Sequence, residues 1–193
     1  MYEPITLDIS PLGVLTDEVL YQLCIINRDM PIERTSKGEL VINMPTGSET
    51  GNKNSYLTAM LFMWNRIYKL GKVFDSSSGF TLPNKAMRSP DAAWVAIERW
   101  QILTHEQQEA FAPLCPDFII ELCSRTDRLK TVQAKMAEWM ENGCRLGWLI
   151  DYSQEKVFIY RADGTMSEVE SFENTLSGED ILPHFELALR ELR

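Results

Sequence analysis

Two acidic side chains in apolar surroundings are the features of this 193-residue sequence that could do chemistry. The first, Glu121, lies inside "CPDFIIELCS" (residues 115–124), whose apolar run predicts a β-strand. Both faces of that strand are mainly apolar, so a carboxylate there loses solvation worth several kcal/mol unless a cation, a metal ion or hydrogen-bond donors meet it. Glu121 is therefore either paired with a nearby arginine, such as Arg125 or Arg128, or functional.

The second acid, Asp91, follows Pro90 in "RSPDAAWVAI" (residues 88–97) and opens another short apolar strand. If the two strands are neighbours, Asp91 and Glu121 can hold one Mg²⁺ or Mn²⁺. Hard divalent cations favour carboxylate and water oxygens, and a phosphate can supply the remaining ligands. Such an ion lowers the pKa of a bound water and stabilises the charge that develops on a phosphodiester. An Asp that only caps a turn explains the same pattern, so both interpretations stay open.

Three helices are predicted to surround these strands, over residues 16–29, 48–71 and 126–143. The expected helix ends are Thr16 as the first N-cap, Gly71 as the second C-terminal cap, and Thr126 or Asp127 and Gly143 as the ends of the third. The second helix has an apolar stripe made by Leu57, Met60, Leu61, Trp64, Ile67 and Tyr68. The stripe of the third helix is Leu129, Val132, Met136 and Met140.

The strand pattern indicates an α/β protein, or an α+β protein if hairpins dominate. A hairpin is expected within residues 32–44, and further strands within 72–82, 90–97, 117–123, 145–164 (two strands) and 184–189. The order strand, helix, strand across residues 117–150 predicts a right-handed βαβ crossover and a mixed sheet. We expect one domain over residues 1–193, with residues 1–30 as a helical arm of the same domain.

Several segments, taken in order, resemble the Uma-two family of putative restriction endonucleases, within the PD-(D/E)XK nuclease superfamily. The segments are "PTGSETGNKN", "VFDSSSGFTLPN", "SPDAAWV", "PDFIIELCS", "TDRLKTVQAKMAEWMENGCRLGWLID", "VFIYR" and "SGEDILPHFEL". The resemblance covers most of residues 30–190. It implies a restriction-endonuclease-like core, with a mixed sheet flanked by helices and preceded by an N-terminal helix and hairpin.

The resemblance also implies catalytic roles for individual residues. Asp91 would be the Asp of "PD", and Glu121 the acid of "(D/E)XK", both binding Mg²⁺ or Mn²⁺. The superfamily's lysine, two positions after the Glu, is replaced here by Cys123, which cannot supply a cation. The resemblance suggests that the lysine has moved to Lys135 on the following helix. Asp117, in the other Pro-Asp pair, is then expected to serve a turn.

On the helical wheel, Lys135 borders the buried stripe beside Trp139, where a long stem could follow the core and deliver its ammonium group into the site. A solvated lysine on a helix flank is the alternative, and Gln133 is the reserve candidate. Glu49, early in the second helix, is a further possible metal ligand by the resemblance, although an acid in a first helical turn is also ordinary dipole chemistry. Ser124 and Asp127 are explained by helix capping.

Composition constrains the partners. The net charge of −9 disfavours DNA, the partner that the resemblance implies, unless metal ions or a local basic strip reverse the electrostatic field at the binding site.

No apolar run approaches the roughly 20 residues that span a bilayer, and the N-terminus lacks a signal-peptide pattern. We therefore expect a cytoplasmic protein with no membrane contact, whose four cysteines are reduced and buried. An enzyme that cuts two strands is also expected to form a homodimer.

Three functions compete on these observations. The first is a metal-dependent endonuclease acting on DNA, in which Lys135 orients the attacking water or stabilises charge on the phosphorus. The second is a catalytically weak or inactive nuclease-fold module used for binding or assembly, favoured by the negative charge and by Cys123. The third is a hydrolase with Cys123 as its nucleophile, which lacks a histidine positioned by sequence to activate the thiol.

Overall fold

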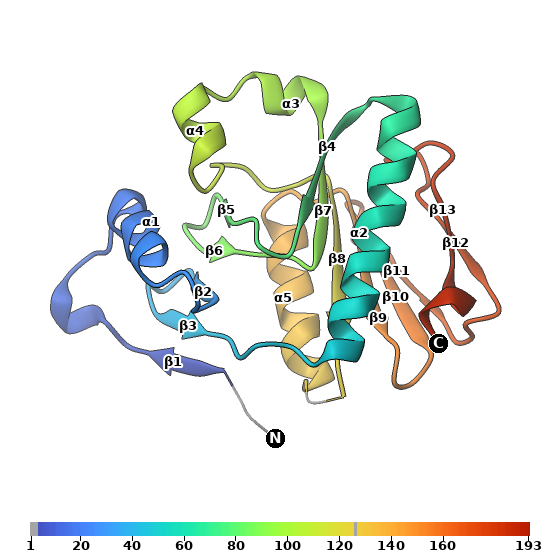
Figure 1. Ribbon diagram of the computed structural model, residues 1–193, viewed down its shortest axis with the longest axis horizontal. Helices are drawn as coiled ribbons and strands as arrows, with labels where there is room; N and C mark the ends of the chain where they lie inside the picture. The colour runs from blue at the N-terminus through green and yellow to red at the C-terminus, as the bar shows by residue number, and fades with distance from the viewer. Residues whose placement is uncertain (1–3, 126) are drawn as a thin grey trace.

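The computed structural model describes residues 4–125 and 127–193 (Figure 1). Its centre is a mixed six-stranded sheet in the order β11-β10-β9-β8-β7-β4, in which β8 and β9 are parallel and the other pairs antiparallel. The strands are β4 (Gly71–Asp75), β7 (Ala92–Ala96), β8 (Phe118–Cys123), β9 (Leu146–Asp151), β10 (Lys156–Arg161) and β11 (Met166–Val169). The mixed α/β class predicted from the sequence is confirmed.

Two helices cover opposite faces of this sheet. Helix α5 (Leu129–Glu141) connects the parallel strands β8 and β9, which is the predicted crossover, and α2 (Ser48–Tyr68) lies on the other face (Figure 1). Side chains of β8 alternate between the two sides: Phe118, Ile120 and Leu122 share a core cluster with α2, whereas Ile119 and Cys123 share one with α5. Glu121 belongs to the α5 side by the same alternation.

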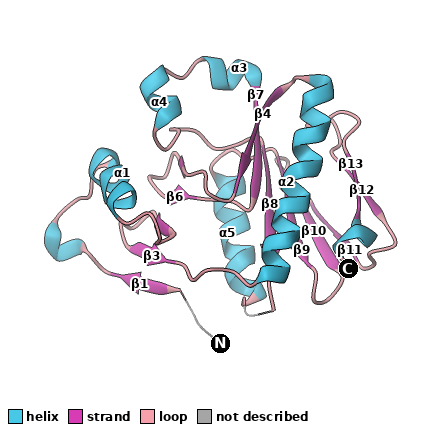
Figure 2. Cartoon of the chain, in the orientation of Figure 1, coloured by secondary structure: helices cyan, strands magenta, loops and turns pink. Residues whose placement is uncertain are grey.

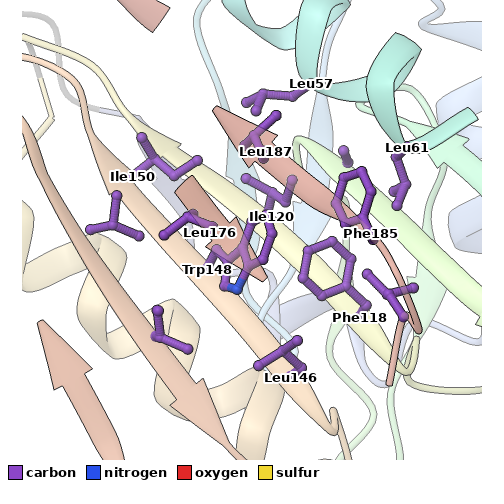
Figure 3. Close-up of a cluster of buried hydrophobic side chains, with 14 of the residues drawn as sticks. Leu57, Leu61, Phe118, Ile120, Leu146, Trp148, Ile150, Leu176, Phe185 and Leu187 are labelled. Atoms are coloured by element: carbon purple, nitrogen blue, oxygen red, sulfur yellow. The ribbon is translucent and has the colours of Figure 1, made fainter. Parts of the chain in front are cut away.

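The C-terminal segment completes the core on the α2 side. Strands β12 (Thr175–Ser177) and β13 (Glu186–Ala188) pair with each other and are followed by a short 3₁₀ helix, Leu189–Leu192. Figure 3 shows Phe118, Trp148 and Phe185 gathered between this segment and the sheet. The rings of Trp148 and Phe185 stack with centroids 5.7 Å apart, and Phe118 meets Trp148 edge-on at 4.9 Å. Such aromatic contacts combine large apolar burial with a defined geometry.

A second sheet lies beside α5, in the order β1-β3-β2-β6-β5 (Figure 2). Its strands are β1 (Ile5–Leu7), β2 (Ile32–Arg34), β3 (Leu40–Ile42), β5 (Phe80–Thr81) and β6 (Met87–Arg88). The predicted hairpin is confirmed as β2–β3, with Gly38 in its turn at φ +88°. A short 3₁₀ helix, Ser10–Leu12, precedes α1 (Asp17–Ile26), which buries Leu20 against this sheet, while α3 (Ile97–Gln101) and α4 (His105–Glu109) bridge β7 and β8.

The end of α2 differs from the prediction. The helix stops at Tyr68, and Lys69 takes the left-handed conformation at its C-terminus, whereas Gly71 is the first residue of β4. Position 71 requires a glycine for a reason other than helix capping, because a Cβ there would lie 2.1 Å from the Val95 carbonyl oxygen and 2.5 Å from the Trp94 ring. The predicted apolar stripe also stops early, because Ile67 is 75% exposed.

The start of α5 also differs from the prediction. The helix begins at Leu129 without a side-chain cap, and Thr126 lies outside the described residues. Asp127 is not the cap, because its carboxylate accepts a hydrogen bond from the Ser124 amide at 2.8 Å and closes the preceding turn instead. Gly143, at φ +103° just after the helix, ends it as predicted.

The close contact at Gly71 leads to a stability prediction. Gly71→Ala should lower the free energy of unfolding by at least about 1–3 kcal/mol, because the added methyl group overlaps the backbone of β7. Gly51→Ala is the matched control, since a Cβ at this helical position meets nothing closer than 3.9 Å. Urea unfolding of both variants measures the difference; equal stabilities would contradict the packing described.

Candidate active site

The antiparallel register of β7 and β8 brings the two predicted acids together. Ala92 pairs with Ile120, so one further step places Asp91 opposite Glu121. Two hydrogen bonds hold this end of the pair: the Asp91 amide donates to the Ile120 carbonyl at 3.1 Å, and the Leu122 amide donates to Asp91 Oδ2 at 2.7 Å. The strand neighbourhood on which a shared metal site depends is therefore present.

Glu121 is buried, with 5% of its surface exposed, and its partners come from α5. Trp139 Nε1 donates to its Oε1 at 2.8 Å, and Lys135 Nζ lies 3.0 Å from Oε1 and 3.2 Å from Oε2. Burial raises the pKa of Glu121 to about 7; the negative charges of Asp91 and Glu33 add to the rise, while Lys135 and Trp139 oppose it. The carboxyl is thus poised to ionise near neutral pH.

Lys135 is the cation of the site. Only 22% of its side chain is exposed, and its Nζ also donates to the Ser89 carbonyl at 2.8 Å and lies 3.1 Å from Glu33 Oε1. Burial by itself would lower the pKa of Lys135, but the charges of Glu121, Glu33 and Asp91 outweigh it and raise the pKa above its ordinary value. Lys135 is a largely buried, protonated group with oxygen partners from three residues, so the solvated-lysine alternative is wrong.

Glu33, on β2, is a site residue that sequence reasoning missed. Its carboxylate accepts from the Ser89 amide at 3.1 Å and lies 3.1 Å from Arg88 Nη1. Burial acts to raise the pKa of Glu33, but Lys135, Arg88 and the hydrogen bonds outweigh it and lower the pKa. The only local indication of a role for Glu33 was its place in a predicted strand, next to Ile32. The partners of Glu33 are more than 50 residues away in the sequence and leave no local pattern.

Asp91 receives its side-chain partner from α2. Asn54 Nδ2 donates to Asp91 Oδ1 at 2.7 Å. Burial raises the pKa of Asp91, against the Leu122 amide, Lys135 and Asn54, which lower it. Asn54 Oδ1 is itself buried and accepts no hydrogen bond from the described residues. Sequence reasoning had not singled out Asn54.

Glu49 is placed differently from Asn54 on the same helix. Its carboxylate is exposed and lies 3.7 Å from Nζ of Lys53, whose ammonium donates to the Leu192 carbonyl. Asn54 lies five positions after Glu49, which turns the two side chains about 140° apart around the helix axis. The contacts from α2 to the acid pair therefore come from Asn54, and a metal-binding role for Glu49 stays a prediction without a supporting contact.

Neighbouring residues named from the sequence have structural roles. Burial raises the pKa of Cys123 to about 12, with Asp151 and Asp127 adding to the rise, so its thiol stays protonated at neutral pH, against a nucleophilic role. Asp117 is fully buried, accepts from the Ala96 amide at 2.9 Å, and lies 3.0 Å from an Arg99 guanidinium nitrogen. Gln133 is half-buried on α5, whereas the contacts to Glu121 come from Lys135 and Trp139.

The donor atoms fit a hard divalent cation. Residues 4–125 and 127–193 contain no group of three or more His, Cys, Asp or Glu side chains arranged to bind a metal. Two adjacent carboxylates and the unpartnered oxygen of Asn54 nevertheless offer hard oxygen ligands, and water and a phosphate can complete the coordination of Mg²⁺ or Mn²⁺. Burial is the largest cause of the raised pKa values of Asp91 and Glu121, and a bound cation would favour the ionised form of both carboxyls.

An open cleft of about 830 Å³ lies between α2 and the segment that follows β4, and Asn54 lines it. Hydroxyl side chains are common in its lining: Thr46, Ser55, Thr58, Ser76, Ser77 and Ser78. None of the described residues that line it is basic, and Asp75 adds an acid. The cleft therefore offers hydrogen-bond donors to a substrate, but no lysine or arginine.

Comparisons with known proteins agree on the kind of fold. The model of a family described as Uma2, putative restriction endonuclease, matches residues 17–190. A solved structure of a putative nuclease belonging to DUF820 from Anabaena variabilis ATCC 29413 superposes with a TM-score of 0.71 at 19% sequence identity, covering 83% of this chain and 88% of that one. No curated protein matches the chain. Within the described residues, no helix is both long and apolar enough to cross a membrane.

The raised pKa of Glu121 predicts a pH-dependent effect of Glu121→Gln in metal-free buffer. A carboxyl whose pKa rises from 4.5 to about 7 on folding stabilises the fold below pH 4.5, and this contribution is lost as the pH rises through 7. The free energy of unfolding of Glu121→Gln minus that of wild type should therefore increase from pH 4.5 to 7 and then level off.

Urea unfolding with EDTA at several pH values measures this difference. Trp139→Phe is the control, because it removes a donor to Glu121 but keeps the titrating carboxyl and therefore the pH slope. A Glu121→Gln difference that is the same at pH 5 and pH 8 would refute the assigned pKa.

Proposed function

Because the chain belongs to the Uma2 family of putative restriction endonucleases, we propose that it is a divalent-metal-dependent endonuclease that hydrolyses DNA phosphodiester bonds. The observation that carries the proposal is the contact of Lys135 with Glu121, opposite Asp91. Asp91, Glu121 and Lys135 come from three separate segments, and the packing brings together the same three residue types that this chemistry requires.

In this proposal Asp91 and Glu121 would hold Mg²⁺ or Mn²⁺, which would supply a Lewis acid and lower the pKa of a bound water. The protein orients both carboxylates through fixed donors. Trp139 holds one oxygen of Glu121, and the Leu122 amide and Asn54 each hold one oxygen of Asp91. The other oxygen of Glu121, Oε2, accepts a hydrogen bond from Lys135 alone within the described residues, so it is the atom best able to change partner.

Lys135 acts through its charge. Its raised pKa keeps the ammonium protonated at neutral pH, so it is an electrostatic group and a hydrogen-bond donor, and not a general base. With a cation held by Asp91 and Glu121, less of the neutralisation of Glu121 would fall to Lys135. The ammonium group can then turn to the attacking water or to the phosphate oxygens, on which negative charge grows during the reaction.

The substrate is expected to bind without a strongly basic surface. The chain carries a net charge of −9, and none of the described residues that line the cleft is a lysine or arginine. We propose that DNA is held by the hydroxyl side chains of the cleft and by the metal ion. The affinity for DNA would then depend strongly on the divalent cation, because phosphate charges that no lysine or arginine neutralises need another cation.

A cleavage assay tests the proposal. Wild type should nick plasmid DNA or cut single-stranded DNA with Mg²⁺ or Mn²⁺ and lose activity with EDTA. Asp91→Asn, Glu121→Gln and Lys135→Met should each reduce cleavage by about 10²-fold or more, because each removes a ligand or the charge that acts on the phosphate. Lys130→Met, which removes an exposed lysine of the same helix, should cleave like wild type.

Circular dichroism of every variant serves as the folding control. The proposal fails if clean wild-type protein cleaves no duplex DNA, single-stranded DNA or RNA with either metal ion. Failure together with no measurable Mn²⁺ binding would instead favour the alternative of an inactive nuclease-fold module used for binding or assembly.

We further propose that the enzyme works as a homodimer through the outer face of α2. Phe62, Met63 and Ile67 expose large apolar side chains on this helix, and Phe62 also lines the cleft. Exposed apolar side chains on a helix beside a substrate cleft suit a contact with a second copy, since a two-fold pair would bring two clefts to one duplex.

Sedimentation velocity tests the dimer. Wild type should sediment as a dimer at micromolar concentration, and Met63→Glu and Ile67→Glu should sediment as monomers, because each buries a charge in the interface. Ile102→Glu, which changes an exposed apolar residue just after α3, should remain dimeric. A monomeric wild type, or variants that stay dimeric, would contradict the assigned face.

A further inference from the structure

We propose that Asn54 is a third oxygen ligand of the divalent cation, alongside Asp91 and Glu121. The inference rests on the proposed metal-dependent function and names a residue of α2 that neither the family match nor the sequence pattern assigns. Its basis is an unusual atom: Asn54 Oδ1 is buried and has no hydrogen-bond partner among the described residues. Buried amide oxygens in proteins are nearly always paired, so an unpaired one requires an explanation.

The position of this oxygen relates it to the site. In the described part of the chain, three buried side-chain polar atoms lack a partner: Asn54 Oδ1, Thr81 Oγ1 and Trp148 Nε1. Of these, only Asn54 belongs to a side chain that also bonds to a carboxylate of the candidate active site. Trp148 Nε1 is a donor and cannot bind a cation. The unpaired oxygen thus lies where a cation held by Asp91 would be close.

The hydrogen bond to Asp91 fixes which end of the Asn54 amide remains free. Nδ2 donates to Asp91 Oδ1 at 2.7 Å. Turning the amide over would set its oxygen against an ionised carboxylate, two acceptors facing each other without a proton. Ionised Asp91 therefore selects the orientation in which the amide oxygen is left over, and an amide oxygen is one of the hard ligands that Mg²⁺ and Mn²⁺ accept.

The ligand set then draws on three elements that meet around Asp91, which bonds to Asn54 and lies opposite Glu121. Asn54 comes from α2, Asp91 from the entry of β7, and Glu121 from β8. Asn54 also lines the cleft, so an ion at these oxygens could meet a substrate that enters there. In this arrangement α2 supplies a neutral ligand, and the acid at its first turn, Glu49, is not needed.

Calorimetric titration of the full chain with Mn²⁺ tests the proposal through binding, without an activity readout. Asn54→Ala should weaken Mn²⁺ binding about tenfold or more, because an oxygen ligand is lost. Asn54→Asp should tighten it about tenfold, because a charged oxygen replaces a neutral one. Ser55→Asp is the matched control: it adds the same charge one residue further along the helix, on an exposed side chain turned about 100° away.

A purely structural role of Asn54 predicts that Asn54→Asp binds Mn²⁺ no tighter than Ser55→Asp. If the amide served only to donate to Asp91, the new carboxylate would repel Asp91 and offer nothing to the ion beyond its charge. The proposal is therefore overturned if Asn54→Asp binds Mn²⁺ no tighter than Ser55→Asp, or if Asn54→Ala binds like wild type. Thermal unfolding in EDTA verifies that all three variants are folded.

A change of metal preference gives a second, independent readout. A thiolate ligand favours soft cations, so Asn54→Cys should raise the ratio of Cd²⁺ to Mn²⁺ affinity at least tenfold over wild type, which contains the same four native cysteines. An unchanged ratio would exclude direct ligation by this position.

Failure of this inference and failure of the proposed function give different results. Wild type that binds no Mn²⁺, or binds it equally well as Glu121→Gln, overturns the metal site itself. Wild type whose binding is lost in Glu121→Gln but unaffected by every Asn54 substitution keeps the metal site and overturns only the role of Asn54.

Discussion

The burial of Glu121 is the physical constraint on which this arrangement depends. Its carboxyl lies inside a sheet strand, opposite Asp91 and near Glu33, and one ammonium group, from Lys135, contacts both glutamates. Three acids around a single lysine leave an excess of negative charge in a poorly solvated place, which the raised pKa values of Glu121 and Asp91 reflect. Such an arrangement has little value for stability, because a buried ion pair seldom stabilises more than packed apolar residues would.

The surrounding fold holds this charge in place. The crossover from β8 through α5 to β9 lays α5 over Glu121, so that Lys135 and Trp139, one turn apart, reach the same carboxylate. The smaller sheet contributes from the side. There Arg88 bonds both Glu33 and Glu138, and so connects β2 and β6 to α5. The two sheets therefore meet α5 at Lys135, whose ammonium contacts Glu121 of β8, Glu33 of β2 and the Ser89 carbonyl.

The acidity of the chain and the chemistry of the site are compatible on this view. Under the proposed function, a protein with a net charge of −9 and a cleft whose described lining lacks lysine and arginine would gain its affinity for a phosphodiester mainly from a bound divalent ion. Lys135 partly neutralises the buried carboxylates of Glu33 and Glu121 in the metal-free protein. The same lysine remains charged for the reaction, because its raised pKa is far above neutrality.

Much of this was accessible from sequence, because local periodicity carries the information. The alternation of apolar residues in β8 placed Glu121 on a buried face, and the stripe of α5 placed Lys135 at its border. Two features could not be predicted from the sequence: the close packing that requires glycine at position 71, and the residue at which α5 begins. Close backbone approach and turn hydrogen bonds leave the spacing of hydrophobic residues unchanged.

The sequence by itself determined the strand, its misplaced acid and the lysine on the next helix. The tertiary structure alone decided the register that sets Asp91 against Glu121. It also brought Glu33 to the lysine that contacts Glu121, and Asn54 to Asp91 from 37 positions earlier in the chain. It also placed Asn54, rather than Glu49, beside Asp91. The physical reason is that contacts between distant segments follow from how whole elements pack, and helix rotation and strand register have no signature in any short stretch of residues.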